Sequence, residues 1–329
     1  MRLIRPSVEL VQPTGYELKD IYKSIEMAGR TCYKSEMSDD AEAFVNRMIN
    51  SQHTAMLEHG TMYFDVPLGS PGDDEEYMWK SSIIQFFKGN RYSVVNKYRK
   101  LHRTDSSNLV VSTDHYAITT NYRVFCEQID WDRFGPMRTT KEGWEVGLDR
   151  GYVLSFLCPP NEHHELRNTF RFVTDRGVSH ELVRHRVFSF AQESTRYCNY
   201  MKEKFGSELT FIIPAHMDLP EGQYMYWDGD WCDVERMTIM SPNAHETNET
   251  NTFLYSLATV ERDYMYLINK GWKPQQARAI LPNALKTEIV MTGFNTDWEH
   301  FIDLRYHGTT GAPHPDMKVV AEKVYKYFS

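Results

Sequence analysis

The spacing of apolar and polar residues predicts helices and strands from the start of the chain. Apolar side chains recur at helical spacing in residues 18–29 and 40–51, and Asp39 and Asp40 are capping candidates for the second helix. Alternation, or the β-branched and aromatic content of a strand, is found in residues 7–12, 61–66 and 169–174. Both kinds of element are therefore expected in the first half.

Two further helices are predicted from their capping residues. Ser179 is a plausible N-cap for a short helix that runs to about Arg184. Thr296 and Glu299 have the spacing of a capping box, so another helix is expected to run to about Arg305.

The last third of the chain has the clearest patterns. Residues 250–270 are predicted as a long amphipathic helix, and residues 273–281 as a second one that Pro282 interrupts. Residues 285–294 are predicted as a strand. Pro315 has the place of a first-turn proline in a final helix, whose apolar stripe is Met317, Val320, Val324 and Phe328.

The segment from about residue 67 to residue 168 differs from its surroundings. It opens with a loop signal at residues 67–74 and continues with aromatic residues and polar turns, without a compact chemical cluster. By resemblance to the family named at the end of this section, we interpret it as an insertion within a single domain of residues 1–329. The chain has no βαβ alternation and no glycine-rich dinucleotide fingerprint, so an α+β fold is predicted.

Composition narrows the class of protein. The chain has 329 residues, of which 41% are hydrophobic, and its formal net charge is -8, so a nucleic-acid partner is not expected. The five cysteines include no C-x-x-C pair, which favours reduced thiols in the cytoplasm. No stretch has the length of a membrane span and no signal peptide is recognised, so we expect a cytoplasmic protein without a membrane partner.

The strongest chemical signal is the segment from Arg184 to Tyr197. From Arg184 to Arg196 it holds three arginines, a histidine and several hydroxyl side chains within thirteen residues. Arginine forks bind phosphate oxygens in paired hydrogen bonds, and hydroxyl groups complete the shell. Two interpretations remain open from these residues alone, a solvated basic turn with salt bridges and a binding site for an anion.

Other polar clusters give weaker signals. His53 to His59 contains two histidines and a carboxylate, but the spacing is not that of a zinc-binding helix, so a hydrogen-bonded turn is favoured and no metal is expected. Residues 162–165 are assigned to the surface or to an interface. Arg305, alone at a helix end, would only complement the helix dipole. No cysteine adjoins a histidine and there is no nucleophile elbow, so a protein nucleophile finds little support.

Together these features resemble the flavin-dependent thymidylate synthases, also called the thymidylate synthase complementing proteins. The hallmark R-H-R-x-x-S followed by S-x-R is present as Arg184-His185-Arg186-x-x-Ser189 and Ser194-x-Arg196. The resemblance also covers residues 28–33, 53–59 and 277–282, and the helix that ends in Leu304-Arg305.

The resemblance implies an α+β fold with an antiparallel sheet flanked by helices, assembled as a homotetramer with shared active sites. It implies reductive methylation of dUMP to dTMP, which makes the protein a methyltransferase. FAD would be the cofactor, with NADPH and 5,10-methylenetetrahydrofolate as co-substrates. No protein nucleophile is required in this reaction.

The resemblance also implies roles for individual residues. Arg305 would lie against the pyrimidine edge as the catalytic residue. The flavin would be bound by His53, Ala55, Arg184, His185, Arg186, Gln192, Phe294, Asn295, Thr296 and His300. The nucleotide would be bound by Glu181, Arg184, Gln192, Glu193, Ser194, Thr195, Arg196, Arg278 and Arg305.

The chain departs from the family pattern at three places. One is the stretch from Tyr306 to Pro315, which is longer than the family pattern and carries two glycines. Ala191-Gln192 stands where Asn-Glu is usual, and Glu181 stands where glutamine is usual. A carboxylate near a bound phosphate is unfavourable unless it faces the base or the ribose. The alternatives to this enzyme are a nucleotide- or RNA-binding module without the chemistry, and a structural protein whose arginines form salt bridges.

Overall fold

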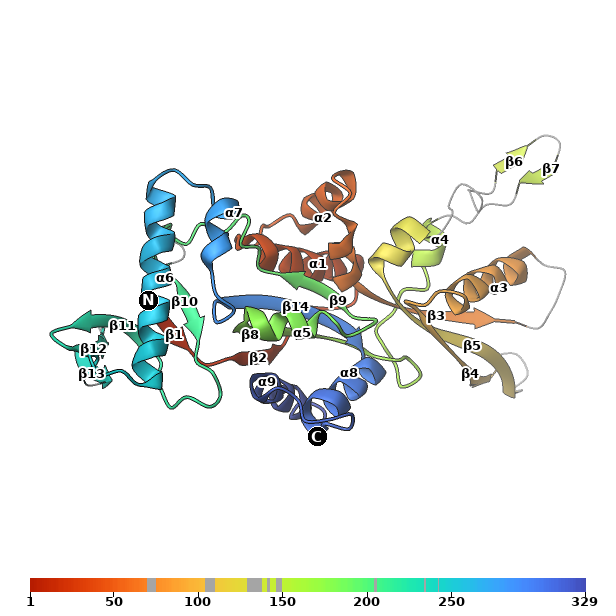
Figure 1. The fold of residues 1–329 in the computed structure, drawn as a ribbon. Helices are drawn as coiled ribbons and strands as arrows, with labels where there is room; N and C mark the ends of the chain where they lie inside the picture. The colour runs from red at the N-terminus through yellow and green to blue at the C-terminus, as the bar shows by residue number, and fades with distance from the viewer. Residues whose placement is uncertain are drawn as a thin grey trace.

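The computed structural model describes residues 1–69, 75–103, 110–128, 138–140, 143–145, 150–203, 206–233, 235–241 and 243–329. These residues form an elongated molecule with a sheet at its centre and another sheet at each end (Figure 1). The mixture of helices with sheets that are mainly antiparallel confirms the predicted α+β class.

The central sheet is antiparallel throughout. Its strands lie in the order β2 (Ser7–Leu10), β8 (Arg167–Asp175), β14 (Lys286–Phe294) and β9 (Ser189–Gln192). Successive side chains of a strand point to opposite faces, and Phe170 and Phe172 therefore share one face with Ile289 and Met291 in the same buried cluster. Val290 lies on the other face, against Ala28 and Ala191.

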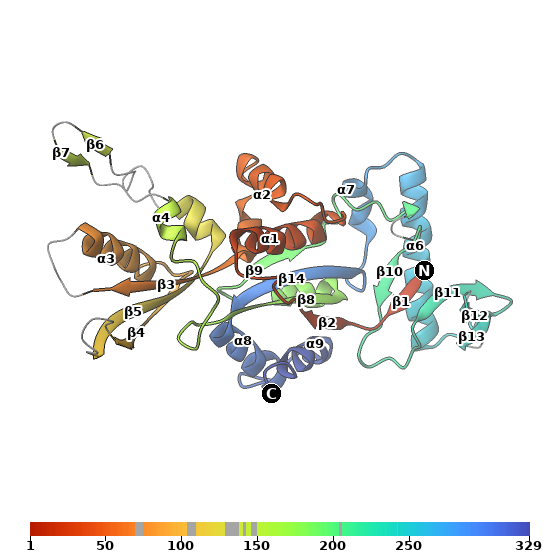
Figure 2. The same ribbon diagram turned by 180° about the vertical axis from the view of Figure 1, so that it is seen from behind.

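Helices cover both faces of this sheet. α1 (Leu18–Tyr33) and α2 (Ala41–Asn50) lie on one side, and α8 (Asn295–Ile302) and α9 (Pro315–Tyr325) lie on the other (Figures 1 and 2). α5 (Arg176–Leu182) contributes Val178 and Leu182 to the core shared with α8 and α9. The antiparallel sheet flanked by helices, expected from the resemblance, is thus present.

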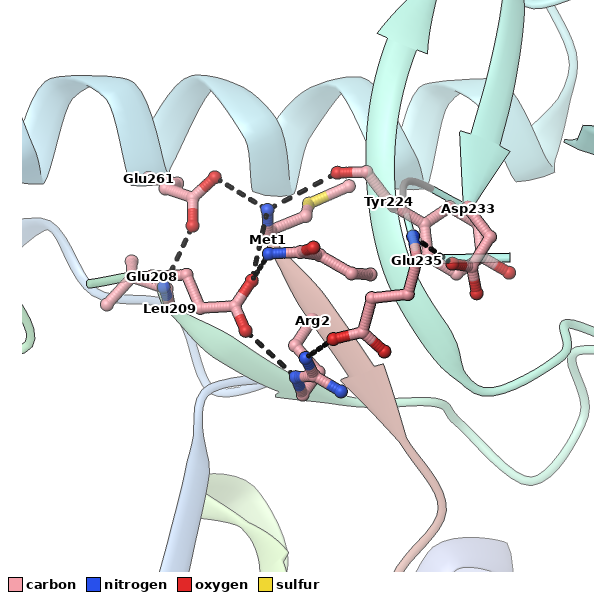
Figure 3. Close-up of polar contacts among 9 residues, drawn as sticks. Met1, Arg2, Glu208, Leu209, Tyr224, Asp233, Glu235 and Glu261 are labelled. Atoms are coloured by element: carbon pink, nitrogen blue, oxygen red, sulfur yellow. Dashed lines mark hydrogen bonds and ion pairs between the residues drawn. The ribbon is translucent and has the colours of Figure 1, made fainter. Parts of the chain in front are cut away.

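The sheet at the N-terminal end of the molecule has the order β10-β1-β11-β12-β13, and α6 (Glu249–Asn269) packs along it. Its strands are β1 (Arg2–Ile4), β10 (Thr210–Ile212), β11 (Gly222–Trp227), β12 (Asp230–Asp233) and β13 (Thr238–Ser241). The Met1 amine lies 3.0 Å from Oε2 of Glu261. The other carboxylate oxygen of Glu261, Oε1, accepts a hydrogen bond of 2.8 Å from the backbone N–H of Leu209 (Figure 3). Glu261 therefore ties α6 to both β1 and the segment before β10.

The opposite end is built from elements between residues 61 and 154. β3 (Thr61–Leu68), β5 (Val110–Asn121) and β4 (Val94–Arg103) form an antiparallel sheet with β5 in the middle, and α3 (Glu75–Lys88) packs on it. Smaller elements follow, namely η2 (Val124–Gln128), β6 (Arg138–Thr140), β7 (Gly143–Glu145) and α4 (Arg150–Leu154). Phe87 and Ile118 share one buried cluster with Ile25 and Phe44, so this end of the molecule packs onto α1 and α2.

Most predicted elements are confirmed with small shifts of their ends. The helices expected at residues 18–29, 40–51 and 250–270 correspond to α1, α2 and α6, and Asp40 caps α2 by accepting from the backbone N–H of Ala43. The predicted helix at 273–281 is shorter, as α7 (Pro274–Ala277) and the 3₁₀ turn η4 (Arg278–Ile280). The predicted loop at 67–74 begins two residues late because β3 extends to Leu68, and residues 70–74 lie outside the described part.

Two predicted caps are wrong. α5 is capped by Asp175, which accepts a hydrogen bond of 2.8 Å from the backbone N–H of Val178, while Ser179 lies inside the helix. At α8 the residue that reaches back is Asp297, whose carboxylate accepts from the Phe294 N–H at 3.2 Å, in place of the Thr296–Glu299 pair. In both cases the helix begins directly after the last residue of the preceding strand, at Arg176 and at Asn295. Both helices therefore begin earlier than the local sequence pattern predicts.

Gly293 of β14 should be intolerant of a side chain. A methyl group at this position would collide with the ring of Phe188, which is itself packed edge-on against Trp298 with ring centroids 4.6 Å apart. We expect Gly293→Ala to lower the free energy of unfolding by about 1–3 kcal/mol, the usual cost of overpacking, as measured by urea denaturation. The matched control is Gly89→Ala, whose new methyl group would have no neighbour nearer than 3.6 Å; equal stability of the two variants would contradict the expectation.

Candidate functional site

The Arg184–Tyr197 segment joins α5 to the central sheet and is anchored in the core by its apolar residues. Phe188 is buried, whereas Arg184 and Arg186 are exposed and form no ion pair with any described residue. A turn held together by salt bridges would have paired these guanidinium groups. They remain available for a ligand.

His185 is the buried member of this segment. Its ring meets Phe301 edge-on, with ring centroids 5.0 Å apart, and its Nε2 accepts a hydrogen bond of 3.0 Å from the Nε of Arg305. Burial, with the positive charge of Arg305 and the proximity of His300, lowers the pKa of His185 to about 4. The imidazole is therefore neutral at neutral pH and can act as an acceptor.

Arg305 lies on a π-helical turn, η5 (Asp303–His307), that continues α8. Its Nη1 donates a hydrogen bond of 2.8 Å to the carboxylate of Glu181 on α5, and its Nε is bonded to His185. Its Nη2 has no partner among the described residues. The guanidinium group is thus fixed at two of its three nitrogens, beyond the dipole-complementing role of an isolated arginine at a helix end.

The second half of the segment surrounds a buried carboxylate. Glu193 is 2% exposed, accepts a hydrogen bond of 3.1 Å from the Tyr200 hydroxyl, and pairs with the Lys286 amine at 2.9 Å. Lys286 also pairs with Glu288, as does Lys34. Although burial alone would raise the pKa of Glu288, these two cations lower it to about 2. The sequence pattern did not single out Lys34, Lys286 or Tyr200 as partners of Glu193. Lys34 and Lys286 are far from Glu193 in sequence, so no local pattern contains these contacts.

A cavity of about 680 Å³ opens beside this network. Residues from α1, β8, β14 and the start of β1 line it, including Arg30, Lys34, Arg171, Glu193 and Lys286. The cavity and the Arg184–Tyr197 segment therefore share Glu193.

The remaining nucleotide candidates lie near the C-terminal end of β9. The side-chain amide of Gln192 donates to Ser179 at 2.8 Å and to Thr287 at 3.2 Å. Ser194 is joined through its backbone N–H to the carbonyl of Cys32 at 3.0 Å, and Thr195 is buried. These contacts fix the turn that carries the next residue, Arg196.

Arg196 is exposed, and its Nε donates a hydrogen bond of 3.3 Å to Gln275 of α7. Arg278 is exposed on η4, the turn that directly follows α7, and forms no ion pair with a described residue. The contact between Arg196 and α7 therefore brings together two segments that each carry an unpaired arginine.

The flavin candidates fall on two sides of the sheet. His53 and Ala55 are exposed at the start of η1 (Thr54–His59), where the hydroxyl of Tyr33 lies 3.4 Å from His53 Nδ1. Tyr33 in turn lies against Tyr197, with ring centroids 5.4 Å apart. His53 is thus connected through two tyrosines to the nucleotide half of the segment.

Phe294, Asn295 and Thr296 lie at the start of α8. Phe294 is buried, and the side-chain oxygen Oδ1 of Asn295 accepts a hydrogen bond of 2.6 Å from the side-chain amide of Asn168. The Thr296 N–H donates to Glu165 at 3.1 Å, and His300 is exposed one turn later. In this single chain, the group around Arg305 and the group around Arg196 make their contacts separately.

Within the described ranges, no group of three or more histidine, cysteine, aspartate or glutamate side chains could hold a metal ion. The His53–His59 segment is instead a 3₁₀ turn in which Glu58 pairs with Arg123 and His59 is bonded to Thr292. No helix among the residues that the structure describes is long and apolar enough to cross a membrane.

The burial of His185 should make stability depend on pH. The folded state disfavours its protonation and the unfolded state does not, so stability is complete above about pH 6.5 and falls as the pH drops towards 4. Each such histidine contributes a slope of about 1.4 kcal/mol per pH unit in that window. We expect His185→Gln to flatten the slope, as measured by urea denaturation from pH 4 to 7. His180→Gln on the exposed side of α5 is the matched control, and identical slopes for wild type and His185→Gln would contradict the assignment.

Comparisons with known proteins point to one family. The family model described as thymidylate synthase complementing protein matches residues 160–329. The chain is 30% identical over 148 residues to the flavin-dependent thymidylate synthase of Mycobacterium avium (strain 104), which covers 44% of this chain and 49% of that protein. It is 31% identical over 150 residues to the enzyme of the same name from Corynebacterium efficiens, covering 45% of this chain and 51% of that one. The matches thus span about half the length of these curated relatives.

Among solved structures, a UMP/dUMP methylase, PolB from Streptomyces cacaoi bound with 5-Br dUMP, aligns with a TM-score of 0.40 and 13% identity. The alignment covers 100% of this chain and 92% of that one.

Proposed function

Because the chain belongs to the thymidylate synthase complementing protein family, whose model matches just over half of it, we propose that it converts dUMP to dTMP by reductive methylation. Methylenetetrahydrofolate would supply the carbon, and NADPH would reduce a bound FAD. The protein would act in the cytoplasm as a homotetramer. The observation that carries this proposal is the guanidinium of Arg305, held by Glu181 and His185 with one nitrogen free.

The cysteines support a route without a protein nucleophile. Burial raises the pKa of both Cys32 and Cys158 to about 11, and Cys198 is fully buried. The thiolate is the nucleophilic form of cysteine, so these three side chains are poorly suited to attack a pyrimidine.

The residues at hand fit a flavin dinucleotide. Its diphosphate needs cations without partners of their own, and Arg184 and Arg186 are exposed arginines of that kind. We propose that His53, Ala55, His185 and Gln192 complete the flavin site together with Phe294, Asn295, Thr296 and His300. When bound and reduced, the flavin supplies the hydride of the reaction.

The nucleotide would be held by the turn after β9. Arg196 and Arg278 are suited to its phosphate, with Ser194 and Thr195 beside them. The carboxylate of Glu193 is already paired with Lys286, so its contribution would be to hold this turn in place. Arg184, Gln192 and Glu181 would complete the site, with Glu181 acting through its ion pair with Arg305.

Arg305 would act on the pyrimidine ring. A fixed positive charge favours loss of the neighbouring N–H proton and stabilises the negative charge that then spreads to C5. Glu181 and neutral His185 would keep the guanidinium from rotating, so its remaining N–H groups point to one place. Electrostatic preorganisation of this kind needs no side chain that forms a covalent bond.

The homotetramer would complete the active site. The groups around Arg305 and Arg196 make separate contacts in one chain, and Arg305 still has one guanidinium nitrogen without a partner among the described residues, while Arg196 is exposed. Apposition of two or more chains would bring one such group against another. Residues 67–168 would remain part of the single domain, because their buried side chains share a core with α1 and α2.

Arg305→Ala should separate flavin binding from methylation. We expect the variant to fold and to retain flavin absorbance, but to lose turnover by about 100-fold or more, the usual effect of removing a fixed donor from developing charge. Turnover is measured as dTMP formed from dUMP, and complementation of a thymidine-requiring bacterial strain tests the whole reaction. Arg262→Ala, at an exposed position on α6, is the control. Full activity of Arg305→Ala would refute its role, and wild-type protein that never takes up FAD would refute the proposed function.

Arg196→Ala should act on nucleotide binding. Loss of a charged hydrogen bond costs about 1.5–3 kcal/mol, so we expect the Kd for dUMP to rise by roughly 10- to 150-fold. Isothermal titration calorimetry measures this directly. Arg99→Ala, an exposed arginine on β4 paired with Asp114, is the matched control. A Kd equal to that of the control would place the phosphate elsewhere.

A further inference from the structure

A second cavity lies at the junction of the β3-β5-β4 sheet and the central sheet. It has a volume of about 260 Å³ and is lined by residues of α1, the start of β3, the start of β8 and the segment after β2. None of the residues assigned above to the flavin or the nucleotide lines it. Its wall includes the buried side chains of Arg167 and His59.

Arg167 is a buried cation without an acidic partner. It is 8% exposed and forms no ion pair within the described part of the chain. Its Nη1 donates at 3.2 Å to both the backbone carbonyl of Glu58 and the hydroxyl of Thr61, and its Nη2 donates to Ser189 at 3.5 Å. Its Nε is buried without any acceptor among the described residues.

The nearest carboxylates are engaged elsewhere. Glu58 pairs through its side chain with Arg123 at 2.6 Å, and Asp297 accepts from the backbone N–H of Phe294. Burial lowers the pKa of Arg167 to about 10, which still leaves it charged at neutral pH. The guanidinium therefore meets neutral oxygens and the ring of Phe294, whose centroid lies 5.4 Å from its central carbon, but it forms no ion pair with a described carboxylate. An anion that entered the cavity would offset the cost of burying this charge.

The rest of the cavity wall suits an apolar body. Tyr16 and Tyr63 meet edge-on with ring centroids 5.9 Å apart, and Ile21 and Leu166 line the same space. The imidazole of His59 is neutral because burial, with Arg167 nearby, lowers its pKa to about 3. The cavity therefore presents one buried cation among aromatic, aliphatic and uncharged polar groups.

We propose that this cavity binds a small organic carboxylate, whose anionic group pairs with Arg167 and whose apolar body packs against Tyr16 and Tyr63. None of the residues proposed for the flavin or the nucleotide lines this cavity, although Phe294 packs against the guanidinium of Arg167. The proposal does not depend on the methylation function. Inorganic anions match the charge of Arg167 but leave the aromatic wall uncovered, so a compact carboxylate is the better fit.

The test uses benzoate with the full-length protein, and benzamide as its uncharged counterpart. We expect benzoate to raise Tm in a concentration-dependent manner and benzamide, phosphate and chloride to have at least tenfold weaker effects. Arg167→Met should weaken benzoate binding at least tenfold. Arg171→Met is the matched control, because it lies on the same face of β8 four residues later and is 40% exposed, paired with Glu9.

A second variant covers the case in which Arg167→Met fails to fold. Ser24→Leu, on the α1 side of the cavity, would fill the space and leave the guanidinium intact; it should also abolish the effect of benzoate. The proposal is overturned if benzoate has no effect on wild type, if phosphate or chloride equals it, or if both variants bind it normally. It is also overturned if saturating dUMP abolishes benzoate binding, because the cavity would then belong to the nucleotide site.

Discussion

The pairing of β8 with β14 fixes where the residues of the candidate site can lie. Nine residue pairs run from Arg167 opposite Phe294 to Asp175 opposite Lys286. A shift by one residue would turn Phe170 and Phe172 out of the core, so the register is set by hydrophobic burial. Hydroxyl groups on the other face reinforce it, since Thr169 and Thr292 are bonded at 2.8 Å and His59 is bonded to Thr292.

This register also explains why Glu181 and Arg305 meet. Because β8 and β14 are antiparallel, their carboxyl ends lie at opposite ends of the strand pair. α5 follows the carboxyl end of β8, and α8 follows the carboxyl end of β14. Both helices bury their apolar side chains against the same sheet face, so they run towards each other across it. Glu181 and Arg305 come together near the end of each path, and neutral His185 fills the space beside them.

The elements were predictable from sequence where one local pattern determined them, as for the amphipathic α1, α2 and α6. Ser179 was a reasonable cap by type, but the Arg176 N–H is bonded to the carbonyls of Asn283 and Leu285, which starts α5 earlier. The ion pair between Glu181 and Arg305 joins residues 124 positions apart, and β1 lies beside β10 about two hundred residues later. No local pattern contains such contacts. The site residues came from resemblance, and the structure supplies the contacts that hold them.

The β3-β5-β4 sheet is joined to the central part of the molecule by residues at the ends of β3 and β5. The Tyr122 N–H is bonded to the carbonyl of Gly60 at 2.8 Å, and Arg123 pairs with Glu58. The carboxylate of Glu58 is thus paired with Arg123, while its backbone carbonyl accepts a hydrogen bond from Arg167. The same residue therefore links Arg123, next to the β3-β5-β4 sheet, with Arg167 at the start of β8. Arg167 forms no ion pair with a described residue, so this junction carries a buried charge in the wall of a cavity.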